Sequence, residues 1–350
     1  VAMRPYSSAR KEAPGQGILL NANEAPWSLL GEAGWEGRLN RYPEPQPEEL
    51  VAGLAGLYGV PEGCVLVTRG SDEGIDLLTR VFCRAGKDAV LHCPPTFGMY
   101  RIAAQAQGAA VVAVTREAGN AFSLNEARLS EALDGDSRIK LLFLTSPNNP
   151  TGDVIRPRTL ENLLLRCRGR ALVVLDEAYA EFCSHPSAAA LLSGHDNLVV
   201  LRTLSKAWAS AGLRCGAVLA QPEVIGLLRR VIAPYPLPSP VIALALRMLE
   251  TDMLERQHEL LREIAANKRM LLDAVASRPF LREIIPGEAN FILVRAGRAD
   301  ELLSFCARRG VILRGFPGEP LLRDYIRISV GSAGDIEALE AVLDEWESEA

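Results

Sequence analysis

One lysine is a candidate for covalent chemistry. Of the 38 basic residues only five are lysine, which leaves 33 arginines. Lys206 follows the apolar run at residues 198–201 and has small and apolar neighbours. Lysine can lose its proton and form a Schiff base, which arginine effectively cannot do. The rarity of lysine and the neighbours of Lys206 therefore make it a candidate nucleophile, with an ordinary surface lysine as the alternative.

Two further apolar runs end in polar side chains. Asp176 ends the run at residues 171–175, and Tyr179 follows it. A carboxylate in that place is partly desolvated and needs a cationic partner, although a helix cap is the alternative. Asn149 lies in S-P-N-N-P-T-G (146–152), and Pro150 after it favours an extended backbone. Its amide could then reach a cleft, whereas an ordinary Asn-Pro turn is the simpler interpretation.

Two other run ends could bind a flat, phosphorylated ligand. After residues 65–68, Gly70 permits a tight turn, and Ser71 or Asp72 can cap the next helix. Free N–H groups at such a helix start suit a phosphate, although a plain capped turn explains them too. Phe97 follows the run at 89–93 and could lie against a ring, or simply pack in its loop.

The elements that must position these residues alternate between short apolar runs and amphipathic stretches. The runs are of strand length and lie at residues 65–68, 89–93, 110–114, 140–145, 172–175, 198–201 and 217–220. Helices are expected between them, for example at 73–82 and 159–167. This alternation predicts an α/β fold with a mostly parallel sheet, whose strand ends gather ligands at one edge.

The chain divides at a proline-rich segment, residues 233–240. Beyond it we expect a long helix at 241–277, strands at 291–294 and 325–330, and helices at 299–309 and 334–347. The predicted organisation is an N-terminal arm (1–40), a large domain (41–236) and a smaller α+β domain (237–350).

Composition excludes several classes of partner. The net charge of −5 argues against nucleic acid, and no apolar stretch approaches the ~18 residues of a membrane span. Seven scattered cysteines without a C-x-x-C pair predict neither a disulfide framework nor a zinc site and favour a reducing cytoplasm. The four histidines are interpreted as structural or exposed, and no metal is expected.

The ordered motifs together are far more specific than any one of them. S-P-N-N-P-T-G (146–152), D-E-A-Y (176–179) and T-L-S-K (203–206) with Arg214 resemble pyridoxal-phosphate (PLP) aminotransferases of fold type I, the aspartate aminotransferase fold. Longer stretches such as L-N-A-N-E (20–24), L-N-R-Y-P (39–43) and C-P-P-T-F-G-M-Y (93–100) are similar to histidinol-phosphate aminotransferases. The resemblance extends from about residue 5 to residue 331.

The resemblance implies a role for each matched residue. Lys206 would hold PLP as a Schiff base, Asp176 would pair with the pyridine nitrogen, and Asn149 and Tyr179 would reach the ring 3-oxygen. The remaining implied PLP contacts are Phe97 on the ring, and Ser71, Asp72, Thr203, Ser205, Arg214 and the neighbouring subunit's Tyr42 around the phosphate. The family often has tyrosine where Phe97 stands, so a hydroxyl is lost there.

The resemblance also implies substrate contacts and an assembly. Arg327 resembles the family's substrate-anion arginine, with Arg314 beside it. Tyr6 and Asn23 resemble arm residues that close the site, Tyr6 from the other subunit. The implied enzyme is a cytoplasmic homodimer with shared active sites.

The implied reaction is transamination between L-histidinol phosphate and 2-oxoglutarate, with glutamate as a product. Aromatic amino-acid transamination and PLP-dependent decarboxylation of a phospho-amino acid remain as alternatives. A non-catalytic PLP-binding regulatory protein is an alternative from another class, although Lys206, Asp176 and Arg327 are all present. A dinucleotide-binding oxidoreductase is disfavoured because no G-x-G-x-x-G turn follows the first strand.

Overall fold

A seven-stranded sheet forms the centre of the larger part of the molecule. The computed structural model describes residues 22–28 and 39–349. The strands are β1 (Val65–Thr68), β2 (Ala89–His92), β3 (Ala110–Ala113), β4 (Ile139–Thr145), β5 (Leu172–Asp176), β6 (Leu198–Thr203) and β7 (Gly216–Ala220). Their order is β1-β7-β6-β5-β4-β2-β3, and β7 alone runs antiparallel to its neighbours. The predicted α/β fold with a mostly parallel sheet is confirmed.

Helices cover both faces of this sheet, which explains why its strands are mainly apolar. One face packs against α3 (Gly70–Phe82), α4 (Met99–Gln107) and α7 (Pro222–Leu228). The other packs against α2 (Glu48–Tyr58), α5 (Glu126–Gly135), α6 (Pro157–Cys167) and α8 (Ser239–Met248). Successive strand residues enter opposite cores, as Val65 and Leu66 do.

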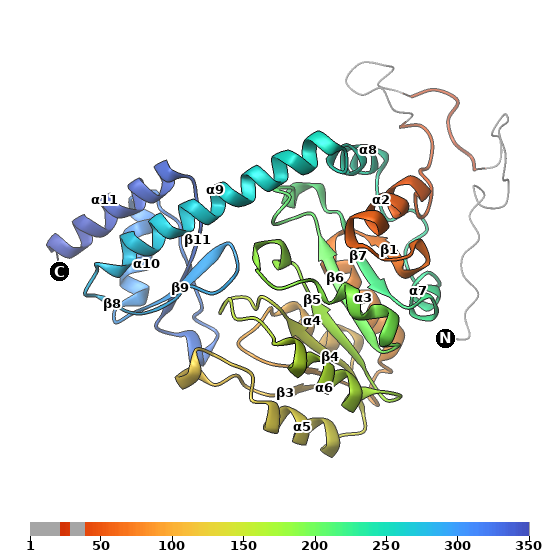
Figure 1. Cartoon of the computed structure of the whole chain (residues 1–350), viewed down its shortest axis with the longest axis horizontal. Coiled ribbons are helices and arrows are strands. Elements are labelled where there is room, and N and C mark those ends of the chain that lie inside the picture. Colours follow the sequence, from red (N-terminus) through yellow and green to blue (C-terminus); the bar gives the residue numbers. More distant parts are fainter. Residues whose placement is uncertain (1–21, 29–38, 350) are drawn as a thin grey trace.

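The smaller part of the molecule, called the small domain below, is built on an antiparallel sheet with the order β10-β11-β9-β8. Its strands are β8 (Leu281–Ile285), β9 (Phe291–Ala296), β10 (Arg314–Gly315) and β11 (Tyr325–Ser329). The helices α9 (Thr251–Ala276), α10 (Ala299–Arg308) and α11 (Ala333–Glu349) pack with it around a separate core. In Figure 1, α9 extends from this part toward the large sheet and α8.

Short 3₁₀ helices also occur between these elements in the described residues. They are η1 (Glu62–Cys64), η2 (Ala118–Asn120), η3 (Ala180–Phe182), η4 (Ala188–Gly194), η5 (Ala211–Leu213) and η6 (Pro320–Leu322). No helix in the described ranges is long and apolar enough to cross a membrane.

The single helix expected at residues 241–277 is wrong, because the chain breaks between α8 and α9. Glu250 has an extended backbone (ψ 152°), and Arg247 pairs across the break with Glu250 at 3.0 Å and Asp252 at 2.5 Å. Helical periodicity persists on both sides, so the sequence pattern hides the break. Because α8 packs on the core of the large sheet, that core also includes residues beyond the expected boundary at 237.

Candidate active site

A cavity of about 530 Å³ lies where β1, β4, β5 and β6 end and where the small domain meets the large one. It brings together twelve of the predicted site residues. They are Ser71, Asp72, Phe97, Asn149, Asp176, Tyr179, Thr203, Ser205, Lys206, Arg214, Arg314 and Arg327. Strand ends of the large sheet supply most of them, and the small domain supplies the two arginines Arg314 and Arg327. The site is therefore built from both domains.

Asp176 is a buried carboxylate at the floor of the cavity. It ends β5 and is 2% exposed. Its oxygens accept hydrogen bonds from the Tyr100 hydroxyl at 2.7 Å and from the Ala178 N–H at 3.1 Å. Burial raises the pKa of Asp176 to about 6, and no cation of the described chain lies within ion-pair distance of it. The site thus holds an anion that lacks a positive partner.

Lys206 is half-buried in the same cavity, three residues after β6. Its Nζ lies 5.8 Å from the centre of the Tyr179 ring. Burial lowers the pKa of Lys206, and the nearby Arg327 charge lowers it further. A depressed pKa increases the fraction of neutral amine, which is the form that attacks a carbonyl. The environment of Lys206 therefore suits the predicted nucleophile.

A cup of hydrogen-bond donors lies beside Lys206. Arg214 contacts the Ser205 hydroxyl at 3.4 Å and the Asp72 carboxylate at 3.1 Å. The helix α3 begins at Gly70, whose φ is +73°, and its first-turn residues Ser71 and Asp72 line the cavity. A Cβ on Gly70 would lie 3.0 Å from Arg214 Nη2, so glycine keeps this space open. The cup suits a phosphate group.

A chain of polar contacts links the two domains across the cavity. Arg327 of β11 donates to the Asn149 amide oxygen at 2.7 Å, and the Asn149 amide donates to the Tyr179 hydroxyl at 3.4 Å. Burial raises the pKa of Tyr179 to about 12, so its hydroxyl stays neutral near pH 7. Near these contacts the backbones of the two domains approach closely at Gly152 and Gly287. A Cβ on Gly152 would lie only 2.7 Å from the Gly287 Cα, so a side chain does not fit there.

Arg327 is a cation without an acidic partner in the described part of the chain. Its Nε is buried and makes no hydrogen bond, and burial lowers its pKa, as does the charge of Arg314. Arg314 lies directly opposite it, because β10 pairs with β11 at these two residues. Adjacent arginines repel each other unless an anion lies between them. This part of the cavity is therefore suited to bind an anionic ligand.

Some site residues were not predicted as such. The cavity also contains Thr96, Thr145, Phe316 and Glu319. Tyr100, which donates a hydrogen bond to Asp176, lies in the first turn of α4, three residues after Phe97, and this spacing could have indicated it. Glu319 follows β10, a strand of two residues, which is too short to leave a periodic pattern.

Three predicted residues are not brought to the cavity. Tyr42 is 50% exposed and stacks on Tyr235 with ring centres 4.5 Å apart, outside the cavity. Asn23 is exposed and also lies outside it. Tyr6 is outside the described residues. The roles predicted for these three residues remain predictions.

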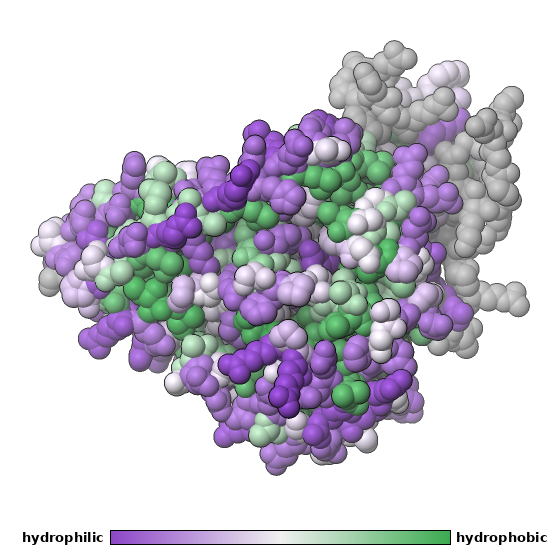
Figure 2. Space-filling view, viewed as in Figure 1, coloured by the Kyte–Doolittle hydropathy of each residue, from purple (hydrophilic) through white to green (hydrophobic). Residues whose placement is uncertain are grey.

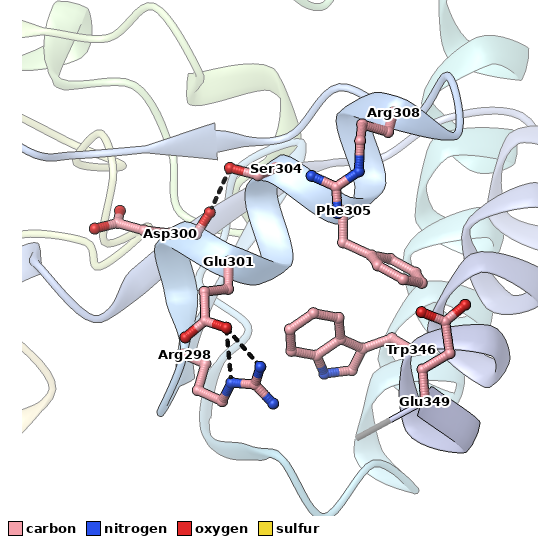
Figure 3. Close-up of a pocket in the computed structure, with 8 residues that line it drawn as sticks. All are labelled: Arg298, Asp300, Glu301, Ser304, Phe305, Arg308, Trp346 and Glu349. Carbon is pink, nitrogen blue, oxygen red and sulfur yellow. Dashed lines mark hydrogen bonds and ion pairs between the residues drawn. The ribbon is translucent and has the colours of Figure 1, made fainter.

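A second hollow, of about 510 Å³, lies between α10 and α11 (Figure 3). Arg298 and Glu301 pair with each other there, and the Ser304 hydroxyl donates to the Asp300 carbonyl. Trp346 and Phe305 are buried beside it. The eight residues that line it include no lysine, cysteine or histidine, so the hollow does not have the chemical groups of the first cavity.

Comparisons with known proteins agree with this geometry. The family model for aminotransferase class I and II matches residues 16–345. The chain is 44% identical to the histidinol-phosphate aminotransferase of Aeromonas hydrophila subsp. hydrophila, over 98% of this chain and 94% of that protein. It is 41% identical to that of Cronobacter sakazakii, over 98% and 94%.

Solved structures share the fold. A histidinol-phosphate aminotransferase from Clostridium acetobutylicum has a TM-score of 0.81 at 18% identity, covering 89% of this chain and 92% of that one. One from Sinorhizobium meliloti, in complex with pyridoxal-5'-phosphate, has a TM-score of 0.80 at 23% identity, covering 89% and 84%. The chain belongs to the class I and II aminotransferases and, within them, to the histidinol-phosphate aminotransferase family.

Proposed function

We propose that this chain is a PLP-dependent enzyme that transfers an amino group from L-histidinol phosphate to 2-oxoglutarate, giving imidazole-acetol phosphate and L-glutamate. The observation that carries the proposal is one cavity that holds a buried anion, Asp176, a lysine of lowered pKa, Lys206, and a cation without an acidic partner, Arg327. The relatives at 41–44% identity support the choice of reaction.

The residues present fit PLP. The uncompensated carboxylate of Asp176 suits a protonated pyridine nitrogen, and the donors around Arg214 and Ser205 suit the phosphate. Phe97 lines the cavity and can cover one face of the ring. When bound, PLP supplies an electron sink that weakens the Cα–H bond of an amino substrate. The pairing with Asp176 keeps a proton at the ring nitrogen, on which that property depends.

Lys206 and Tyr179 serve proton transfer and positioning. With an amino substrate bound, Lys206 Nζ would accept the proton from the substrate Cα and would deliver it to the former aldehyde carbon of the cofactor. The lowered pKa of Lys206 leaves more of the amine neutral, which makes it a more available base, and its protonated form can return the proton as an acid. The neutral Tyr179 hydroxyl, held by Asn149, can donate a hydrogen bond to the ring 3-oxygen.

The two arginines explain how one cavity accepts both substrates. Histidinol phosphate carries a phosphorylated carbon where glutamate carries its α-carboxylate. Arg327 can bind either anion, and the opposing Arg314 adds donors for the larger phosphate. Glu319 also lines the cavity from the small domain and would favour a positively charged imidazole over a phenyl ring. This acid favours histidinol phosphate over aromatic amino acids.

The proposed enzyme is a homodimer in the cytoplasm. Large apolar side chains are exposed at residues 22–28 and 39–42 and on α8, including Trp27 (81%) and Leu244 (55%). Figure 2 shows apolar residues gathering over α8 and α2. Such exposed apolar residues support an interface, from which the partner's Tyr42 would reach the phosphate cup. All seven cysteines are free, which supports a reducing compartment.

The test is replacement of Lys206. In Lys206→Ala we expect loss of the visible absorbance of the protein-bound Schiff base and a fall in turnover of about 10⁴-fold or more. Lys87→Ala is the matched control, because Lys87 is exposed and does not line the cavity, and it should behave like the parent. Normal turnover in Lys206→Ala would refute the proposal.

Assays on the PLP-loaded parent enzyme separate this transamination from the alternative reactions. Histidinol phosphate should convert the bound PLP to its amino form in the parent enzyme without release of CO₂. Release of CO₂ from a phospho-amino acid would indicate a decarboxylase. Faster conversion by phenylalanine than by histidinol phosphate would indicate an aromatic aminotransferase.

A further inference from the structure

A cluster of metal-binding side chain types lies at the junction of the two domains, outside the active site. Cys183 and His185 follow η3 in the large domain, and Glu288 lies between β8 and β9 in the small domain. One ligand atom from each lies within 4.8 Å of the others. Glu288 is 105 residues from Cys183 in sequence, so spacing alone had predicted no zinc site.

We propose that Cys183, His185 and Glu288 bind one divalent cation of the Zn²⁺ class, with the fourth position open to water. A thiolate, an imidazole and a carboxylate form a donor set that binds zinc in preference to magnesium or calcium. On binding, the Cys183 thiol releases its proton to solvent, and its sulfur forms the metal bond in place of the hydrogen bond to Glu288.

The distances match this chemistry. The Cys183 sulfur lies 3.6 Å from His185 Nδ1 and 3.2 Å from Glu288 Oε2, and the latter two atoms are 3.8 Å apart. Ordinary zinc bond lengths at tetrahedral angles place such atoms about 3.4–3.6 Å apart. Each pair is therefore within about 0.4 Å of the separation that a bound zinc ion requires, and small side-chain shifts complete the site.

The surroundings supply support and access. Ser184 donates to Glu288 Oε2 through its N–H and its hydroxyl, each at 3.1 Å, which orients the carboxylate. Lys268 holds the backbone on either side of Glu288, donating to the Gly287 and Ala289 carbonyls. The His185 side chain is 44% exposed, so an ion can enter from solvent.

The ion would tie the two domains together. The Glu288 N–H also donates to the Gly152 carbonyl at 2.7 Å, three residues after Asn149. Cys183 lies four residues after Tyr179. A bound cation would thus connect the small domain to the loop after Tyr179, next to the contact with the Asn149 loop.

The test uses the metal-stripped, PLP-loaded enzyme. Calorimetry with Zn²⁺ should give one ion per chain, and Co²⁺ should give the visible bands of a tetrahedral site with a sulfur ligand. Cys183→Ser, His185→Gln and Glu288→Gln should each weaken Zn²⁺ binding by at least ~10-fold. His258→Gln, which removes an exposed histidine outside the cluster, is the matched control and should bind like the parent.

Two results would overturn the proposal. One is no saturable binding of Zn²⁺ or Co²⁺ by the parent enzyme. The other is unchanged affinity in Cys183→Ser, which would place the ion elsewhere. The cobalt spectrum is recorded on the parent enzyme, so it decides the matter even if a variant folds poorly. The proposal does not depend on the reaction catalysed, because each measurement follows the metal.

Discussion

Asp176 and Glu177 are neighbouring carboxylates at the end of β5, and both are buried, but their surroundings differ in charge. Glu177 accepts from Arg202 at 2.7 Å, which also pairs with Glu181 at 2.7 Å. Asp176 has a hydroxyl and an amide as its partners and no cation within ion-pair distance in the described chain. One carboxylate is therefore compensated by the protein and the other is not.

The difference separates structure from function. Burial of a charge is costly unless an opposite charge accompanies it, so Glu177 and Arg202 form a pair that folding alone can satisfy. Asp176 and, on the small domain, Arg327 are left without partners of opposite charge, and both line the cavity. We infer that each is matched by a ligand, the first by a ring nitrogen and the second by a substrate anion.

Removal of Arg202, the cation that pairs with Glu177, should give the largest loss of stability. Arg202→Met leaves the buried Glu177 and the partly buried Glu181 without their cation, and removal of one partner of a buried pair costs about 3–5 kcal/mol. We expect the free energy of unfolding, measured with urea, to fall by that amount. Addition of Glu177→Gln and Glu181→Gln should restore part of it. A loss below about 1 kcal/mol would show that the triad is not an important source of stability.

Replacement of Asp176, which has no cationic partner, should lower activity but raise stability. In Asp176→Asn we expect kcat/KM to fall by about 10²–10³-fold, because an amide cannot hold a proton on the ring nitrogen. The unfolding free energy of the PLP-free protein should instead rise by about 3 kcal/mol at pH 7, since the pKa of Asp176 is raised from 3.8 to about 6.

The pH dependence provides the control for this variant. A carboxyl with a raised folded pKa contributes full stability below pH ~4 and loses it as the pH rises through about 6. The advantage of Asp176→Asn over the parent should therefore vanish near pH 4 and be complete above about pH 7. An advantage that is constant with pH would mean that the carboxylate charge is not its cause.

The small-domain arginines should divide by substrate. Arg327→Ala removes a half-buried cation and should lower kcat/KM for both half-reactions by about 10²–10³-fold. Arg314→Ala removes an exposed one and should lower it about tenfold for histidinol phosphate and less for glutamate. Single-turnover rates with each amino donor measure both. Equal losses for the two donors in Arg314→Ala would contradict this division.

Much of the site could be predicted from sequence because its residues follow strand ends. The seven apolar runs were long enough to identify the strands, and Asp176, Asn149 and Lys206 lie at the strand ends or within four residues of them. Other parts depend on contacts between distant segments. The break at Glu250, the two-residue strand β10 and the pairing of Cys183 with Glu288 leave no local pattern, since packing and side-chain pairing determine them.

The smallest expected effect concerns Glu319, which we propose favours histidinol phosphate over aromatic amino acids. It is half-buried at the cavity edge, so water weakens its attraction to an imidazolium, and we expect about a two- to fivefold loss of kcat/KM for histidinol phosphate in Glu319→Gln. Phenylalanine has no charged ring, so its rate should not change. The loss should shrink at high salt, because partly exposed charges are screened, and also above the pKa of imidazole, where the ring is neutral. Equal losses for both donors would show that Glu319 shapes the cavity and does not read the charge of the ring.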